Sequence, residues 1–144
     1  MTKTFDMQFI RYMNLFQRIT RVNSTHCFLY NNTIVFVIPR RDIMAAIGRD
    51  NSNLKKLSGI LLKRIRVVAE PKDDKDLHGF ISVLVDPATI EKTEIISGAS
   101  GKELILTPAG RESKAMIIGR DRARETEIKN ILDQHFGIKD VKII

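Results

Sequence analysis

The chain has 144 residues, 43% of them hydrophobic and 28% charged, which is typical of a folded globular protein of one ordinary domain or two small ones. Its single cysteine, Cys27, excludes an intrachain disulfide and any metal site needing two cysteine ligands from one chain. The net charge of +7 favours an anionic partner, of which nucleic acid is the commonest, although a merely solubilising surface is the alternative. Residues 1–6 lack the apolar run of a secretory signal, so we expect a cytoplasmic protein without membrane association.

Hydrophobic periodicity predicts a helix followed by a β-hairpin at the start of the chain. The helix is predicted over residues 6–22. The residues expected on its buried face are Phe9, Ile10, Met13, Phe16 and Ile19. Strands are predicted over 27–30 and 33–38, with Asn31-Asn32 as a tight turn between them and Pro39 ending the second strand.

Two more helices and a strand are predicted before a polar linker. A short helix over 41–47 is stopped by Gly48, and a second helix begins near Ser52. Its apolar residues at helical spacing are Leu54, Leu57, Ile60 and Leu61. A strand over 64–69 follows, and then a run of polar or helix-breaking residues over 70–76. This run predicts a domain boundary within 70–77, with a first domain over 1–70 and a second over 71–144.

The second half repeats the same order of elements. A helix is expected over 77–85, although its valines leave a strand open, followed by strands over 93–96 and 103–106 with a turn at 98–101. A helix over 113–118 stops at Gly119, and a longer one runs to Phe136 with Gly137 as its stop. A last strand is predicted over 138–144. Glu125 and Lys129 are expected to form an ion pair along one face of the long helix, with no catalytic role.

The two halves share one identical four-residue segment. Ile47-Gly48-Arg49-Asp50 and Ile118-Gly119-Arg120-Asp121 are the same four residues between a short helix and a longer one. Glycine admits a close approach of a sugar-phosphate chain, the following helix offers unpaired backbone N–H groups, and the arginine adds a forked charged donor. The alternative is purely structural: the glycines stop helices, and Asp50 and Asp121 cap the next ones.

The order helix, hairpin, helix, glycine loop, helix, strand resembles the type II KH domain. A pair of such units in so short a chain resembles the archaeal NusA family of transcription termination and antitermination factors. The resemblance implies an α+β fold of two consecutive KH-like domains, each a small three-stranded sheet with helices packed on one face. It also implies that a Gly-x-x-Gly loop clamps single-stranded RNA, here the nascent transcript, with bases in an apolar groove beside it. A direct contact with RNA polymerase is left open.

The two loops depart from the family pattern at their last position. The first is Gly48-Arg49-Asp50-Asn51 and the second ends in Arg122. Asparagine tolerates left-handed backbone angles better than arginine, so the first loop is the stronger site, while Arg122 could add a phosphate contact. The further candidate RNA contacts are Lys55, Lys56 and Arg124, with a solvated helix face as the alternative. Ile47 and Ile118 line the groove or belong to the core.

No catalytic pattern is found, so we expect neither an enzyme, nor a small-molecule substrate, nor a cofactor or metal. His26, His78 and His135 are scattered, without metal-ligand spacing. Three other functions stay open. One is a KH-type RNA-binding protein of the ribosome or of RNA processing. Another is a duplex-DNA regulator, in which 43–62 would be a helix-turn-helix. The third is an adaptor that binds no nucleic acid and whose degenerate loops only support a protein interface.

Overall fold

The computed structural model describes residues 3–144; residues 1 and 2, part of the amino-terminal segment in which no secretory signal is expected, lie outside the described part. The chain divides into two compact units, Met1–Glu70 and Pro71–Ile144. Each unit repeats one element order, in which a helix and a hairpin precede two helices and a strand. Among the described residues, no helix is both long and apolar enough to cross a bilayer.

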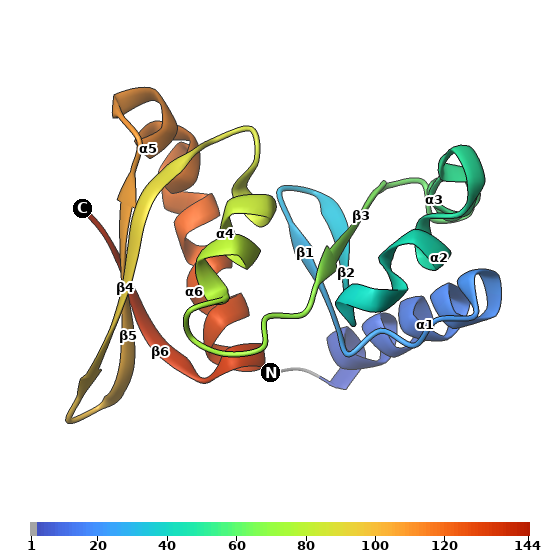
Figure 1. The fold of residues 1–144 in the computed structure, drawn as a ribbon, viewed down its shortest axis with the longest axis horizontal. Coiled ribbons are helices and arrows are strands. Elements are labelled where there is room, and N and C mark those ends of the chain that lie inside the picture. Colours follow the sequence, from blue (N-terminus) through green and yellow to red (C-terminus); the bar gives the residue numbers. More distant parts are fainter. Residues whose placement is uncertain (1–2) are drawn as a thin grey trace. The chain divides into compact units, whose positions relative to one another are not determined.

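Unit 1 is one sheet with its helices on one face (Figure 1). Its long helix is α1 (Lys3–Thr20), and its hairpin is β1 (His26–Tyr30) and β2 (Thr33–Ile38). The elements that follow are a 3-10 turn (Arg40–Asp42), α2 (Ile43–Ile47), a second 3-10 turn (Arg49–Asn51), α3 (Ser52–Leu61) and β3 (Arg64–Ala69). The strand order is β1-β2-β3, with β2 antiparallel to β1 and parallel to β3.

The core of unit 1 lies between the sheet and these helices. The ring of Phe16 on α1 stacks on that of Phe36 in the central strand, with centroids 4.3 Å apart, and both side chains are fully buried. Leu57 brings α3 to the same core. The predicted turn is confirmed, because Asn31 and Asn32 both have positive φ, at 51° and 58°, as a two-residue hairpin turn requires.

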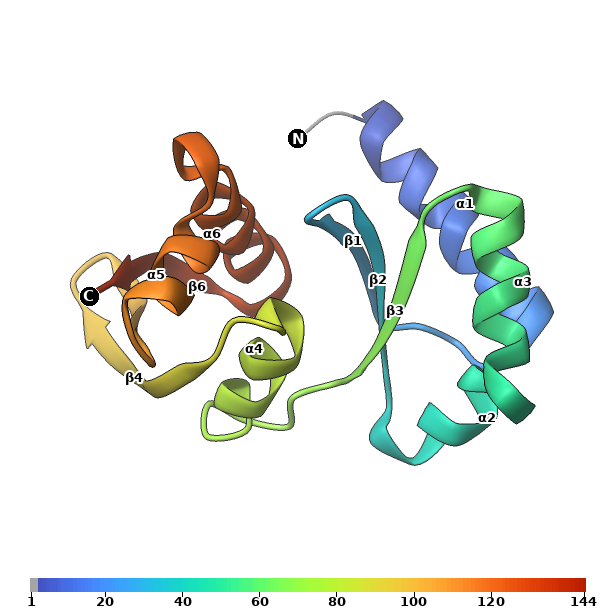
Figure 2. The same cartoon turned by 90° about the horizontal axis from the view of Figure 1, so that it is seen from above.

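Unit 2 has the same topology (Figures 1 and 2). It contains α4 (Leu77–Val85), β4 (Ile90–Gly98), β5 (Gly101–Pro108), α5 (Arg111–Ile118), a 3-10 turn (Arg120–Arg122), α6 (Ala123–Phe136) and β6 (Ile138–Ile143). Its strand order is β4-β5-β6, antiparallel then parallel. Phe80 on α4 packs edge-on against Phe136 on α6, with ring centroids 4.9 Å apart. The expected α+β class with two consecutive KH-like units is therefore confirmed.

Several details differ from the expectations. The strands of the second hairpin run over 90–98 and 101–108, longer than predicted, because each residue gains ladder partners across the hairpin that no local pattern reports. Ile10 and Ile60, placed on buried helix faces by their spacing, are 55% and 54% exposed. Their helices are covered on one side only, and a period of 3.6 residues does not say where the covered stripe ends. The region 77–85 is a helix, which settles the alternative of a strand.

Candidate nucleic-acid interface

The two glycine loops have the same backbone conformation. Gly48 has φ 80° and ψ 173°, and Gly119 has φ 77° and ψ 169°. Asp50 and Asp121 share a φ of 55°. The final positions are left-handed in both loops, at φ 61° for Asn51 and φ 61° for Arg122. Arginine therefore adopts the conformation that the sequence favoured only for asparagine, and the two loops share their backbone angles.

Each loop glycine is required by its surroundings as well as by its φ. A Cβ on Gly48 would lie 2.7 Å from the hydroxyl oxygen of Ser52, and one on Gly119 would lie 2.6 Å from Cγ of Arg124 and 2.9 Å from its backbone nitrogen. These distances are far below ordinary carbon contacts, so the following helix packs directly against the glycine. The side chain of Arg124, a candidate phosphate contact, is therefore part of the packing of its own loop.

The capping roles considered for Asp50 and Asp121 are not found. The residues that precede α3 and α6 are Asn51 and Arg122, and neither makes a side-chain cap hydrogen bond. The two aspartates lie one residue earlier, inside the loops and exposed. A left-handed residue turns the chain away from the geometry in which a cap side chain reaches the next N–H groups. The amino-terminal ends of both helices thus lack a side-chain acceptor, which suits an anion.

The basic residues near the first loop are unpaired in the described structure. Arg49, Lys55 and Lys56 are all exposed, and none of their side chains makes a hydrogen bond or an ion pair with residues 7–144, whose side chains are described. Residues 47–57 hold three basic side chains and one acidic one, a local net charge of +2. The loop therefore carries uncompensated positive charge beside an open helix terminus.

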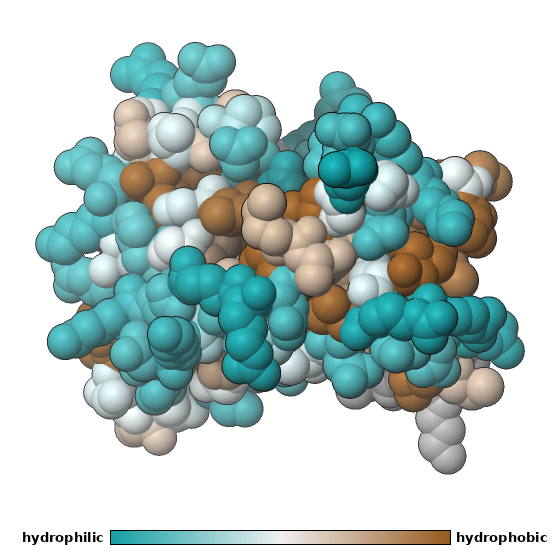
Figure 3. Space-filling view, turned by 45° about the vertical axis from the view of Figure 1, so that its right-hand side comes forward, coloured by the Kyte–Doolittle hydropathy of each residue, from teal (hydrophilic) through white to brown (hydrophobic). Residues whose placement is uncertain are grey.

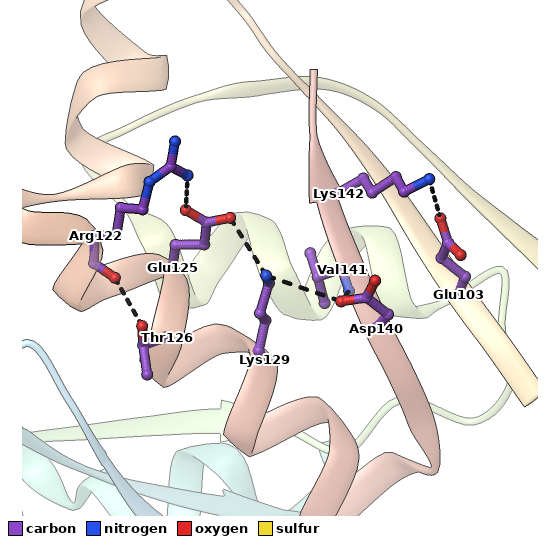
Figure 4. A network of polar contacts seen from close by, with 8 residues as sticks. All are labelled: Glu103, Arg122, Glu125, Thr126, Lys129, Asp140, Val141 and Lys142. Atoms are coloured by element: carbon purple, nitrogen blue, oxygen red, sulfur yellow. Dashed lines mark hydrogen bonds and ion pairs between the residues drawn. The ribbon is translucent and has the colours of Figure 1, made fainter. Parts of the chain in front are cut away.

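The second loop is electrically different (Figure 4). Arg122 Nη1 lies 2.7 Å from Glu125 Oε1, and Arg124 Nε lies 3.1 Å from Glu127 Oε1. Residues 118–128 hold three basic and three acidic side chains, so the local net charge is zero. Two of the three arginines proposed as phosphate contacts are thus already paired with carboxylates of the same helix, and Arg120 is the exception.

Comparison with known proteins gives relatives of one kind. No protein-family model matches the chain. Proteins described as "Probable transcription termination protein NusA" match from Halococcus morrhuae, at 23% identity over 93% of both chains, and from Methanococcus vannielii, at 26% over 92% of this chain and 74% of the relative. One from Halobacterium salinarum is 22% identical over 90% of this chain and 89% of the relative. The chain is NusA-like. The expected resemblance to the archaeal family is confirmed over nearly its whole length.

A solved structure shares the fold of both units. The crystal structure of APE1850 superposes on the NusA-like chain with a TM-score of 0.71, covering 96% of this chain and 99% of that one at 25% sequence identity. Both units therefore belong to the shared architecture.

A signal that the sequence reasoning missed is the division of charge between the units. Residues 1–70 hold twelve lysines and arginines against four aspartates and glutamates, a net charge of +8. Residues 71–144 hold twelve against thirteen, a net charge of −1. The overall +7 of the NusA-like chain therefore belongs to unit 1. Counting charges separately on either side of the predicted boundary would have found it.

Exposed apolar surface also lies close to the first loop. Met44, which the sequence reasoning did not select, is 81% exposed one helical turn before Gly48, whose N–H donates to the Met44 carbonyl. Ile47 and Ile118 are half-buried, which is intermediate between a residue that lines the groove and one that belongs to the core. Figure 3 shows apolar side chains exposed among polar ones on the visible face of unit 1, the right-hand half of the view. An apolar surface beside unpaired cations suits the bases and phosphates of a single strand.

Proposed function

We propose that this NusA-like protein is a non-enzymatic factor that binds single-stranded RNA through the first glycine loop and acts in transcription elongation, termination or antitermination. The observation that carries the proposal is the open loop of unit 1. Gly48 admits the RNA backbone, and the amino-terminal end of α3 has no side-chain cap. Arg49, Lys55 and Lys56 add charge that no described carboxylate neutralises. Ile47 and the exposed Met44 offer apolar contact for the bases.

The electrostatic balance supports a polyanion at unit 1. A surface of net charge +8 on a unit of this size attracts phosphates over about one Debye length, roughly 8 Å at physiological salt. Asp50 is exposed in the middle of the loop, but it is outnumbered by the three neighbouring cations. Recognition of single strands by backbone contact and shallow apolar surface needs no aromatic platform.

The test is binding of fluorescent single-stranded RNA, single-stranded DNA and duplex DNA by anisotropy across a salt series. The first-loop variant is the triple substitution of Arg49, Lys55 and Lys56 by alanine. Its matched control replaces Lys72, Arg111 and Lys114, three exposed cations of unit 2, in the same way. Both variants lose three positive charges. A difference between their RNA affinities therefore shows where the RNA binds and does not merely reflect the total charge.

We expect RNA to bind best and the first-loop variant to lose most of the affinity. Its log–log salt slope should become shallower by about 0.7 for each phosphate that the altered loop no longer binds. The control should bind within a few-fold of the wild type. Equal reductions in both variants would mean that only diffuse charge acts, and a preference for duplex DNA would favour the DNA regulator instead.

The proposed role in transcription rests on the names of the relatives, and a separate assay tests it. Purified protein is added to elongating archaeal RNA polymerase in a reconstituted reaction, and pausing and termination are scored on a template with a defined terminator. We expect the wild type to change the fraction terminated and the first-loop variant not to. An RNA-binding protein that leaves pausing and termination unchanged, and sediments with ribosomal particles, would belong to the ribosome or to RNA processing.

A further inference from the structure

Glu125 is the buried carboxylate beside the second loop. It follows Arg122 by three residues at the start of α6, and its side chain is 10% exposed while that of Arg122 is 72% exposed. Glu125 Oε1 accepts a hydrogen bond from Arg122 Nη1 at 2.7 Å, and its Oε2 lies 3.6 Å from Lys129 Nζ. The helix-face pair expected between Glu125 and Lys129 is confirmed, at 3.6 Å. The carboxylate is buried, and it also holds the loop arginine.

These contacts continue from the loop toward the sheet (Figure 4). Lys129 Nζ lies 3.9 Å from Asp140 Oδ1 on β6, and the hydroxyl of Thr126 donates a 3.0 Å hydrogen bond to the Arg122 carbonyl. Arg122 is thus fixed through both its side chain and its backbone. A carboxylate largely shielded from water holds a cation more firmly than a fully exposed one, because water screens the pair less.

Unit 1 has nothing equivalent at the corresponding positions. Counting from the loop glycine, Glu125 corresponds to Leu54, Arg122 to Asn51 and Lys129 to Ser58. The backbone is the same in both loops, so the difference between them lies in the charges of the side chains and not in the conformation.

We propose that Glu125 closes the second loop to RNA, so that the protein grips RNA phosphates through the first loop alone. This inference rests on the proposed function. A phosphate that approaches the second loop meets Arg122 already neutralised, and the carboxylate of Glu125 repels it. The second loop keeps the shape of an RNA clamp without a net positive charge, and Glu125 is the residue that decides which loop binds.

The experiment restores the positive charge of the second loop in a variant whose first loop no longer binds RNA, so that any RNA binding by the second loop can be measured. The background is the triple alanine variant at Arg49, Lys55 and Lys56, and the added change is Glu125→Gln, which preserves the side-chain volume. The probe is a short single-stranded RNA followed by anisotropy across a salt series. We expect Glu125→Gln to raise the affinity about tenfold, equivalent to about 1.4 kcal/mol, and to steepen the salt slope by about 0.7.

Asp133→Asn in the same background is the matched control. Asp133 lies on the same helix and pairs with Lys139 at 3.3 Å, so its removal also releases one lysine and adds one unit of net charge. It follows Arg122 by a helical rise of roughly 16 Å, which exceeds the Debye length at physiological salt. We expect less than a twofold change from this variant.

A third variant tests whether the gain in RNA affinity depends on Arg122. Adding Arg122→Ala to Glu125→Gln should return the affinity to that of the background. Arg122→Ala in the otherwise wild-type protein should leave RNA binding unchanged, because the arginine is already occupied. This single variant keeps the proposal testable if Glu125→Gln fails to fold, which a thermal melt would reveal.

The outcomes separate this inference from the function on which it rests. If the wild type binds RNA through the first loop but Glu125→Gln gives no gain, or gives one that Asp133→Asn matches, the proposal on Glu125 is overturned and the proposed function stands. A several-fold weaker affinity for Arg122→Ala in the wild type would also overturn it. Wild-type protein that does not bind RNA would overturn both.

Discussion

The side-chain amide of Asn53 donates a 3.1 Å hydrogen bond to the carbonyl oxygen of Ala46, across the first glycine loop. The same amide nitrogen lies 3.3 Å from the Ala45 carbonyl. These carbonyls stand at the carboxyl end of α2, where no helical partner remains for them, and Asn53 lies at the start of α3. One side chain therefore joins the two helices on either side of the loop, and it also packs against Gly48.

Replacing Asn53 tests this clamp. Asn53→Asp puts a carboxylate against two carbonyl oxygens, so we expect a decrease of about 1–3 kcal/mol in the free energy of unfolding, whereas Asn53→Ala should lower it by about 1 kcal/mol. Urea unfolding followed by circular dichroism measures both. Asn14→Asp, on the exposed side of α1, is the control and should stay within about 0.5 kcal/mol. An alanine variant as stable as the wild type would show that these hydrogen bonds contribute nothing.

We expect Gly48→Ala to destabilise the folded state, whatever its effect on RNA binding. The φ of 80° is unfavourable for any L side chain, and the added Cβ would meet the Ser52 hydroxyl at 2.7 Å, so we expect the free energy of unfolding to fall by about 1–3 kcal/mol. Gly59→Ala in α3 meets nothing within 4 Å and should gain about 0.5–1 kcal/mol. Chemical denaturation of the two variants shows the contrast. If Gly48→Ala proves as stable as the wild type, glycine is there for RNA access alone.

Leu62 is a strained end of α3. It has φ 58° and ψ 36°, its side chain is 84% exposed, and its N–H closes the helix on the Ser58 carbonyl at 2.8 Å. Leu62→Gly should raise the free energy of unfolding by about 0.5–1 kcal/mol, because glycine is at ease in this left-handed position. The reverse change, Gly137→Ala at the end of α6, should cost about 1 kcal/mol, since φ is 69° there and nothing obstructs a Cβ. Thermal melting of both variants tests the pair, and a lower melting temperature for Leu62→Gly would contradict it.

Stability should fall at alkaline pH through Cys27. Burial among apolar side chains raises the pKa of its thiol well above the ordinary value of 9.0. The folded state therefore holds a proton that the unfolded chain releases above about pH 9, and the free energy of unfolding should drop by up to about 1.4 kcal/mol per pH unit there. Cys27→Val removes this group. Urea unfolding from about pH 7 to about pH 10.5 should show a steeper decline for the wild type, and parallel declines would contradict the assignment.

The sequence by itself determined the duplication, the order of the elements and the position of both glycine loops. These follow from signals that act over a few residues. The period of apolar side chains specified α6 and β2, Asn31-Asn32 specified the hairpin turn, and Gly48 and Gly119 marked the ends of two helices. Such local preferences operate in the same way wherever the segment is finally packed.

Only the tertiary structure decided which basic side chains of the two loops are paired with carboxylates. The local sequence around Asn51 and Arg122 does not reveal that both residues have the same left-handed backbone conformation. It also does not reveal that Glu125 is buried and contacts Arg122. Burial and ion pairing depend on which helix face other elements cover, and those elements come from distant parts of the chain. The same limit explains the exposure of Ile10 and Ile60. Sequence spacing places a side chain on a helix, but only packing decides whether water, core or a neighbouring charge surrounds it.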